Sequence, residues 1–426
     1  MCPNIPPIGV MHAAPIVRSC IIRGRCMKRI GGFGSGFGES LTKLRGVAAQ
    51  PLPVAIEFGT SSLKVLQVAQ QSEQVSLVAA GALPIPEAMW DKPEKRLQFQ
   101  LEALPNLLKS SGVKAKRAVC SIPISQTICR ILKVTRIEGM TVSELTASAL
   151  GAQIGCPPAA LVVRPTVISG GTKGNPKMDV LCLAARRDLV ETLMRAMKAS
   201  KLEPVGIQNE FIAMMDAFAP LSRRSEDHNS NTLYIDMGFG ATNVLIAHGR
   251  DPVFAKSIDV GGRTFDQTIA KLMKIDDDDA HERRLKMRSV QPADADDHAQ
   301  ASQSSVNDRL ASAVGVATRV EAVHGPKLSL IEPMEILTDE LALCLRYHDS
   351  AFPDKPLSRI VFVGGESRHR MLCEHVARAI RLPAQVADPM AIVNRSGKEP
   401  VTGVDMTKPQ PGWAVALGLC LGKTDL

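Results

Sequence analysis

Two stretches of this 426-residue chain repeat one local pattern, and the repeat constrains the fold more than any other feature of the sequence. In each stretch an apolar strand ends at an acidic residue, a glycine follows two positions later, and a polar turn leads into a second strand. The acidic residues are Glu57, in 54–68, and Asp236, in 233–247. Two copies about 180 residues apart predict two related domains that face one ligand.

The second turn combines a carboxylate with unobstructed backbone. Asp236 is followed by Gly238 and Gly240, and the missing side chains leave backbone N–H groups able to face a phosphate. A carboxylate at the mouth of such a turn is also well placed to hold hydrated Mg²⁺, which prefers oxygen ligands and keeps several waters. Taken alone, the stretch fits a plain hairpin loop equally well. The matching pattern at 54–68 favours the phosphate-binding interpretation.

Composition indicates a globular protein of two or more domains. The length exceeds one ordinary hydrophobic core, and 45% of the residues are hydrophobic. The formal charge is +8, but residues 1–50 hold seven basic residues against one acidic residue. The rest of the chain is nearly neutral, so no nucleic-acid surface is expected. We expect 1–50 to be a flexible basic leader, and Met27 is an alternative start to Met1.

The cysteines and the hydropathy pattern favour a cytoplasmic protein. The ten cysteines form no C-x-x-C pair and no Cys/His spacing suited to zinc. They fit small buried hydrophobic residues in a reducing compartment. No apolar run approaches the ~20 residues that a membrane helix needs.

Periodicity predicts alternating strands and helices after the first hairpin. The expected strands are 75–83, two within 118–135, 161–168, 178–185, 205–209, 252–258, 359–363 and 384–387. The expected helices are 94–110, 142–154, one from Asp188, 210–219, 263–274, one after 276–279, 330–349 and 413–421. Thr141 and Glu144 form a capping box before the second helix. The stretch at about 288–326 is rich in Ala, Asp, Ser and Gln, so we expect a disordered insertion.

Two further glycine pairs stand where a ligand can approach the backbone. Gly261 and Gly262 open a predicted helix, whose N-terminus favours an anion. Gly364 and Gly365 follow the strand 359–363 and precede a helix. A flat ring or a sugar can lie against such a bare backbone.

In this order, the two acidic hairpins and the strand-Gly-Gly-helix unit resemble the phosphate-one, phosphate-two and adenosine motifs of the actin-like ATPase superfamily. Within it, the chain is most similar to the FtsA/PilM branch, and closest to the type IV pilus assembly protein PilM. The likeness covers about 53–421. The segments that carry it are 55–64, 236–238, 242–243, 261–262, a helix with Ala280, Glu282 and Lys286, 364–365, 388–389 and 416–419.

The resemblance implies an α/β actin-like ATPase fold, with two duplicated RNase H-like domains around a nucleotide cleft. We expect the first domain at 51–220 and the second at 230–421. An inserted subdomain of the FtsA/PilM type is expected at about 130–205.

The same resemblance implies that ATP and Mg²⁺ bind between the domains. The implied cofactor-binding residues are Glu57, Gly59, Thr60, Ser61, Ser62, Lys64, Gly238, Gly240, Ala241, Thr242, Asn243, Gly261, Gly262, Glu282, Lys286, Gly364, Gly365 and Glu366. Asp236 and Glu57 are the metal candidates, with Asp236 binding through water. Glu282 and Lys286 would flank the sugar or base. Asp236 and Gln208 are the catalytic candidates; Gln208, or else Glu210, would orient the attacking water, although either residue also suits a simple helix start.

One departure from the family pattern bears on activity. The first phosphate motif normally carries aspartate where this chain has Glu57. Because the geometry that Mg²⁺ demands is strict, the hypothesis is slow or absent ATP hydrolysis. Whether the chain is an enzyme is left open.

The function implied by the resemblance is a cytoplasmic scaffold of a type IV pilus or type II secretion-like assembly. It would dock the cytoplasmic tail of an inner-membrane component, contact other assembly proteins and reach the membrane only through its partner. Self-association is compatible with this role. The alternatives are an FtsA-like cell-division protein, a small-molecule kinase of the same superfamily, and a member that uses the fold only for protein contacts.

Overall fold

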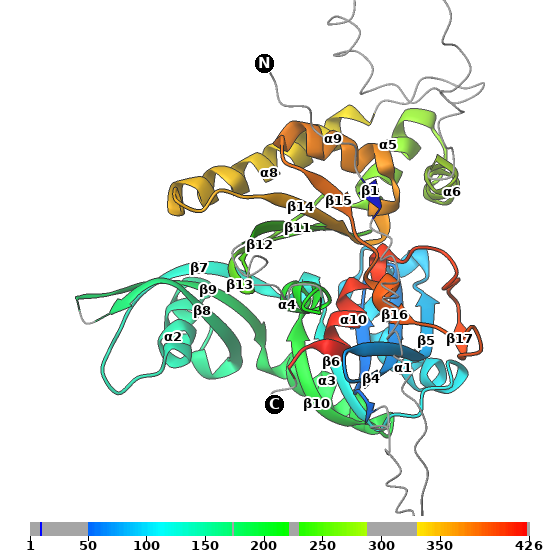
Figure 1. Ribbon diagram of the computed structural model, residues 1–426, viewed down its shortest axis with the longest axis horizontal. Helices are drawn as coiled ribbons and strands as arrows, with labels where there is room; N and C mark the ends of the chain where they lie inside the picture. The colour runs from blue at the N-terminus through cyan, green and yellow to red at the C-terminus, as the bar shows by residue number, and fades with distance from the viewer. Residues whose placement is uncertain (1–8, 11–49, 173, 221–229, 288–329, 424–426) are drawn as a thin grey trace, which may run out of the picture.

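The computed structural model describes residues 9–10, 50–172, 174–220, 230–287 and 330–423, which form three β-sheets (Figure 1). Most of the predicted leader and the whole predicted insertion at about 288–326 lie outside the described residues; two leader residues form strand β1 (Gly9–Val10). Among the helices described, none combines the length and the apolar composition needed to cross a membrane.

An eight-stranded sheet forms the lower half of the molecule in Figure 1, in the main order β10-β6-β3-β4-β5-β16. Its strands are β2 (Gln50–Pro51), β3 (Val54–Phe58), β4 (Ser62–Gln71), β5 (Gln74–Pro84), β6 (Arg117–Ile122), β10 (Glu203–Asn209), β16 (Val393–Asn394) and β17 (Val401–Thr402). Its two faces are covered by α1 (Pro93–Ser110), α3 (Arg187–Ala199), α4 (Glu210–Asp216) and α10 (Ala414–Leu421).

Both faces of this sheet are buried, and the side chains of β3 alternate between them. Val54, Ile56 and Phe58 pack in a cluster with the apolar residues of α1 and α3. Ala55 packs on the opposite side, with residues of α4 and α10. Because alternate side chains enter two buried clusters, the strand is apolar without interruption up to Glu57.

A six-stranded sheet forms the upper half, in the order β1-β15-β14-β11-β12-β13. Its strands after β1 are β11 (Asn231–Met237), β12 (Thr242–His248), β13 (Asp251–Ile258), β14 (Arg359–Val363) and β15 (Ala384–Val386). Its outer face carries α5 (Gly262–Met273), α8 (Ile331–Ala351) and α9 (Arg370–Ile380), and α6 (Asp277–Met287) packs on α5.

The two sheets repeat one plan, which confirms the predicted duplication. In each, three consecutive strands form an antiparallel meander, β3-β4-β5 and β11-β12-β13. A later strand then joins parallel to the first, β6 beside β3 and β14 beside β11. Helices α4 and α10 lie between the two halves and pack on residues of both sheets (Figure 1).

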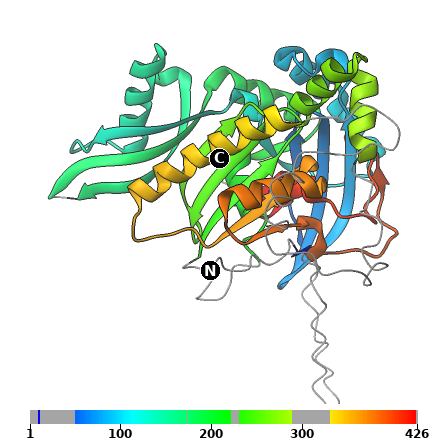
Figure 2. The ribbon, with the colours of Figure 1, turned by 90° about the horizontal axis from the view of Figure 1, so that it is seen from above.

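The third sheet is the predicted insertion and has the order β7-β9-β8. It consists of β7 (Ile128–Thr135), β8 (Leu161–Thr172) and β9 (Asn175–Arg186), with α2 (Val142–Ile154) on one face. The capping box of Thr141 and Glu144 is present at the start of α2. Figure 2 shows this sheet projecting to one side of the body. Because α3 packs on the first sheet, the separate sheet ends at Arg186 and does not extend to about 205.

Helices α4 and α10 cross at Gly418, and this contact leaves no room for a side chain. A Cβ at Gly418 would overlap the carbonyl oxygen of Ala213. The close approach fixes α4, whose first residue, Glu210, lies at the junction of the two halves.

We expect Gly418→Ala to destabilise the protein by about 1–3 kcal/mol, because the added methyl group must push α10 away from α4. Urea unfolding followed by circular dichroism measures the effect. Gly174→Ala is the control, since its Cβ meets nothing within 4 Å, and it should stay within about 0.5 kcal/mol of wild type. Equal stability of the two variants would contradict the tight crossing.

Candidate functional site

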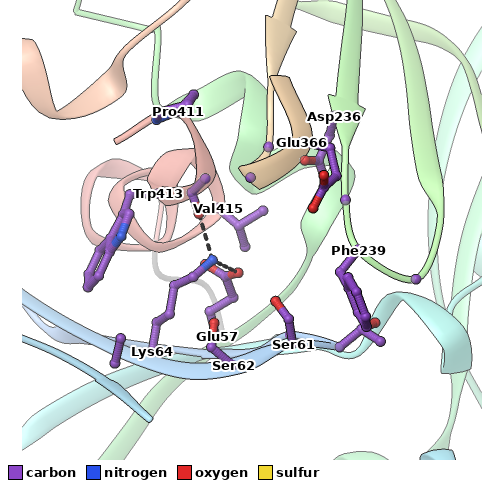
Figure 3. Close-up of a pocket in the computed structure, with 18 of the residues that line it drawn as sticks. Glu57, Ser61, Ser62, Lys64, Asp236, Phe239, Glu366, Pro411, Trp413 and Val415 are labelled. Atoms are coloured by element: carbon purple, nitrogen blue, oxygen red, sulfur yellow. Dashed lines mark hydrogen bonds and ion pairs between the residues drawn. The ribbon is translucent and has the colours of Figure 1, made fainter. Parts of the chain in front are cut away.

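A cavity of about 330 Å³ lies between the two sheets, where both acidic turns open toward each other (Figure 3). Fourteen of the residues predicted from sequence line it: Glu57, Gly59, Thr60, Ser61, Ser62, Lys64, Asp236, Gly238, Gly240, Ala241, Asn243, Gly364, Gly365 and Glu366. The cavity thus collects side chains from strands that are almost 180 residues apart in sequence.

The two turns are closed by the same hydrogen bond. The Gly59 N–H donates to the Ser62 carbonyl over 3.1 Å, and the Gly238 N–H donates to the Ala241 carbonyl over 3.0 Å. A Cβ at either glycine would lie within 3 Å of that same carbonyl oxygen, so the turns require glycine at these positions. The sequence repeat is therefore a repeat of backbone geometry.

The tips of the turns present unused amides to the cavity. In the part of the chain that the structure describes, the N–H groups of Thr60, Ser61, Gly240 and Ala241 donate to no backbone carbonyl. The two tips also touch each other, since a Cβ at Gly240 would lie 2.8 Å from Thr60 Oγ1. Converging free amides are the donors that a phosphate group needs.

Glu57 and Lys64 form an ion pair on the floor of the cavity (Figure 3). Lys64 Nζ lies 2.6 Å from Glu57 Oε1 and donates a second hydrogen bond of 2.6 Å to the Gly412 carbonyl. Glu57 Oε2 is buried and finds no hydrogen-bond partner among the described residues. A buried carboxylate oxygen without a donor is costly, so a metal-bound water would find a ready acceptor here.

Asp236 stands on the opposite side of the cavity (Figure 3). Burial raises the pKa of Asp236 to about 6, and the charge of Glu57 raises it as well, against a hydrogen bond from Asn243. That bond runs from Asn243 Nδ2 to Asp236 Oδ2 over 3.1 Å. Gly364 lies against the same carboxylate with a φ of +92°, and a Cβ there would collide with Asp236 Oδ1.

The structure distinguishes the two candidates for orienting the attacking water, because only one of them lines the cavity. Gln208 does not line the cavity; its carboxamide donates a 3.0 Å hydrogen bond to Asp216 Oδ2. Glu210, two residues later, does line it, and the Ser121 hydroxyl donates to Glu210 Oε1 over 3.4 Å. Burial, and then the charges of Glu57 and Asp236, raise the pKa of Glu210 well above its usual range.

Thr242, Gly261 and Gly262 support the second turn from behind. The Thr242 hydroxyl donates to the Val260 carbonyl over 2.6 Å. The Gly262 N–H, the first of α5, donates to the Gly238 carbonyl over 3.1 Å, so a carbonyl of the turn caps the start of the helix. None of the three lines the cavity.

Helix α6 faces the cavity with residues other than the two that the resemblance implies. Glu282 and Lys286 are largely exposed and pair with each other over 3.1 Å. His281 and Leu285, one position earlier in each case, line the cavity. Both pairs have the same four-residue spacing, so the helical period could not tell which face turns inward.

Aromatic residues complete the walls. Phe239 lies at the tip of the second turn and meets Trp90 of the first half edge to face, with ring centroids 4.6 Å apart. Trp413 lines the other end of the cavity, beside the start of α10. Neither role had a signal in the sequence, because both depend on contacts between the two halves.

The residues present fit a nucleotide with a hydrated divalent ion. A Cβ at Gly365 would meet no protein atom within 4 Å, so the backbone there is bare toward the cavity. Lys64 and the free amides can bind phosphate oxygens, and Glu57 and Asp236 can accept hydrogen bonds from metal-bound waters. Within the described ranges, no three acidic, His or Cys side chains are grouped closely enough to hold a metal directly. The donor set therefore suits an ion that keeps its waters.

Three comparisons relate the chain to known proteins. The family model described as type IV pilus assembly protein PilM matches residues 55–297, more than half of the chain. No curated protein matches. Among solved structures, a PilM-PilN type IV pilus biogenesis complex has a TM-score of 0.63 at 19% identity, covering 87% of this chain and 97% of that chain.

Two other solved structures are more distant. The ethanolamine utilization protein EutJ from Carboxydothermus hydrogenoformans has a TM-score of 0.44 at 13% identity, covering 88% of this chain and 91% of that chain. MreB5 of Spiroplasma citri bound to ADP has a TM-score of 0.42 at 14% identity, covering 87% and 94%. Two matched turns on duplicated sheets, a third inserted sheet and the family match agree: this chain has the actin-like ATPase fold and belongs to the family of the type IV pilus assembly protein PilM.

Proposed function

We propose that this chain is an ATP-binding scaffold of a type IV pilus or related secretion assembly, which hydrolyses ATP slowly or not at all. It docks the cytoplasmic tail of an inner-membrane component and so works at the cytoplasmic face of the membrane. The observation that carries the nucleotide half of this proposal is the pair of glycine turns that present free amides to one cavity from opposite sheets.

The charges of the cavity support binding of a magnesium-nucleotide complex. Lys64 would leave its ion pair with Glu57 to meet a phosphate, which frees Glu57 to accept from metal-bound water. Asp236 would accept from another such water. When bound, Mg²⁺ supplies positive charge that offsets both the phosphates and these carboxylates.

The raised pKa of Glu210 supports slow hydrolysis. With Gln208 turned away, Glu210 is the buried polar side chain on α4 that faces the cavity. Its raised pKa favours the neutral acid, which cannot accept a proton from an attacking water. The extra methylene of Glu57, compared with aspartate, adds a second departure from the geometry that the metal demands.

A separate cleft supports docking of a peptide. A cavity of about 230 Å³ lies between the first sheet and the inserted sheet, and its lining includes the apolar residues Val162, Val163 and Leu183 and the exposed cation Arg164. The PilM-PilN complex is a solved structure with a similar fold. The resemblance to the PilM family implies a partner tail beside the inserted subdomain, and we propose this cleft as its docking place.

We expect Asp236→Ala to abolish Mg²⁺-dependent ATP binding and Glu57→Ala to weaken it less. Glu57 already shares its charge with Lys64, whereas Asp236 has only the Asn243 amide as a hydrogen-bond partner among the described side chains. Isothermal titration calorimetry with and without Mg²⁺ measures both, and Glu102→Ala on the exposed face of α1 is the control. Equal losses would show that the two turns share the ion.

The same titrations decide the wider proposal. If the wild-type protein binds no nucleotide, the ATP-binding proposal fails. Phosphate release in a single-turnover assay tests the remaining clause, and brisk turnover would remove slow hydrolysis while leaving binding intact.

The raised pKa of Asp236 predicts a pH-dependent strain in the nucleotide-free protein. Because its pKa is about 6 when folded and close to 4 when unfolded, the folded state holds the proton more tightly. The stability that Asp236 contributes is therefore present below pH 4 and is lost as the pH rises through 6. We expect Asp236→Asn to raise the Tm relative to wild type more at pH 7.5 than at pH 4.5, measured by differential scanning fluorimetry. An equal Tm difference at both pH values would contradict the assigned shift.

We expect Val163→Asp to lower the affinity for a partner tail at least tenfold, because it places a charge in the apolar wall of the docking cleft. The probe is a fluorescent peptide of the cytoplasmic tail of a PilN-like protein from the same organism, measured by anisotropy. Val167→Asp is the matched control, since Val167 lies on the same strand, is 44% exposed and does not line the cleft. Equal binding by both variants would place the docking site elsewhere.

A further inference from the structure

A second cavity, of about 210 Å³, adjoins the tips of the two turns. Thr60 and Gly240 line both cavities, but neither Lys64 nor Asp236 lines the second. The walls of the second cavity come instead from the first turns of α1 and α5 and from Trp90. Pockets for drug-sized ligands begin at roughly 300 Å³, so this cavity suits a smaller ligand.

Arg96 of α1 brings a buried positive charge to the second cavity. It is 6% exposed, and no carboxylate among the described residues forms an ion pair with it. Its guanidinium donates to the Trp90 carbonyl and, over 3.5 Å, to the Ser125 hydroxyl, and both acceptors are neutral. Burial lowers the pKa of Arg96, and the more distant charges of Asp91 and Glu210 offset only part of this effect. A charge taken out of water is costly unless it is paired, so a cavity beside this guanidinium suits an anion.

Arg263 of α5 brings hydrogen-bond donors to the same cavity from the second half of the molecule. Its Nη2 pairs with Asp91 over 3.1 Å and with Asp277 over 2.8 Å. Its Nε and Nη1 are buried and have no hydrogen-bond partner among the described residues. These two nitrogens carry three of the five N–H groups of the guanidinium. Oxygen atoms of a ligand in this cavity would therefore meet donors that have no acceptor within the described chain.

The Trp90 ring compensates Arg263 only in part. The guanidinium carbon of Arg263 lies 5.4 Å from the centre of the ring. The face of an aromatic ring attracts a cation, but it is a weak hydrogen-bond acceptor. An anion in the cavity would offer this guanidinium both charge and strong acceptors.

The carboxylates that line the second cavity are exposed to solvent. The side chain of Asp91 is 65% exposed and already pairs with Arg263. Asp259 is exposed as well. Water and salt screen these two charges, whereas the guanidinium of Arg96 is shielded from water. The buried part of the cavity therefore carries a net positive charge.

We propose that Arg96 and Arg263 together bind a small oxyanion, of the class of inorganic phosphate, at the junction of the two halves. Guanidinium N–H groups match the oxygens of a phosphate in geometry as well as in charge. Arg96 belongs to the first half and Arg263 to the second, so one anion held by both arginines joins the halves. Neither arginine belongs to the proposed nucleotide site, so this inference goes beyond ATP binding and does not depend on it.

The anion would bind beside the place where the two halves already touch. A Cβ at Gly240 would lie 2.8 Å from Thr60 Oγ1, and both residues line the second cavity. An anion held there stabilises the arrangement in which the two turns face each other. Because it binds the folded chain and not the unfolded one, phosphate should raise the Tm of the nucleotide-free protein.

The first test is the affinity of the full chain for inorganic phosphate, measured by calorimetry without nucleotide and at constant ionic strength against chloride. Wild type should bind phosphate saturably, and Arg96→Gln and Arg263→Gln should each weaken binding at least about tenfold, since hydrogen bonds to charged groups are lost. Lys95→Gln on α1 and Lys271→Gln on α5 are the matched controls. Both lysines are exposed, and each control removes the same charge from the same helix, so binding should stay within about twofold of wild type.

The two tryptophans of the chain locate the anion, because each lines one cavity only. Trp90 lines the second cavity and Trp413 lines the nucleotide cavity. In the Trp413→Phe variant, phosphate should change the emission of Trp90 with the midpoint found by calorimetry. In the Trp90→Phe variant, the emission of Trp413 should not respond at that midpoint. This titration changes neither arginine, so it tests the site even where Arg96→Gln folds poorly.

Three results would overturn the inference. A response of Trp413 without one of Trp90 would place the phosphate in the nucleotide cavity. Equal weakening by Lys95→Gln and Arg96→Gln would show attraction to the general charge of α1. Uptake of phosphate that never saturates would show that no site exists. Failure of the protein to bind ATP would remove the proposed function but would leave this site standing.

Discussion

The excess of buried carboxylates in one cavity is the constraint on which the rest of this structure depends. Glu57, Glu210, Asp236 and Glu366 all line the space between the sheets, and the cations that meet them by ion pairs are Lys64 and Arg284 in the described chain. Charges taken out of water cost several kcal/mol each unless they are paired. The protein meets this cost by holding two carboxylates in ion pairs and raising the pKa of the other two.

This arrangement supports the proposal that a nucleotide binds here together with a metal ion. A polyphosphate alone would add negative charge to a cavity that already holds an excess of carboxylates. A hydrated divalent cation offsets the charge of the phosphates and of the carboxylates. The buried, unpaired oxygen of Glu57 and the raised pKa of Asp236 are two signs of the same imbalance. The carboxylates stay close together because α4 and α10 pack between the two sheets.

The sequence predicted the parts of this site that follow from local backbone. The two acidic turns and the strand before the Gly-Gly pair were placed within a residue, because glycine spacing and strand period are local signals. The resemblance implies that Glu282 and Lys286 of α6 face the cavity, but His281 and Leu285, one position earlier, do so. Both pairs have a spacing of four residues, so the helical period does not distinguish them. The contacts of His281 with Phe239 and Trp90 decide which side of α6 faces the cavity. The helix predicted at 210–219 ends at Asp216.

The contacts that cross between segments had no sequence signal. Arg284 meets a carboxylate 82 positions away, and Lys64 meets a carbonyl 348 positions away. The resemblance implies that Gln208 orients the attacking water, but Gln208 donates a hydrogen bond to Asp216 of the neighbouring α4 and does not line the cavity. Such pairings depend on tertiary packing, and no local pattern in a single sequence shows which distant residues will meet.

The two binding places of the proposed function meet at the start of α4. Asn209 lines the cleft beside the inserted sheet, and its side chain caps α4 by accepting from the Ile212 N–H over 2.9 Å. Glu210, the next residue, lines the nucleotide cavity. A ligand in the cleft that moves the Asn209 cap would therefore also move Glu210, which lines the nucleotide cavity. Any coupling through this turn must be equal in both directions, because the effect of one ligand on the affinity of the other is a single free energy.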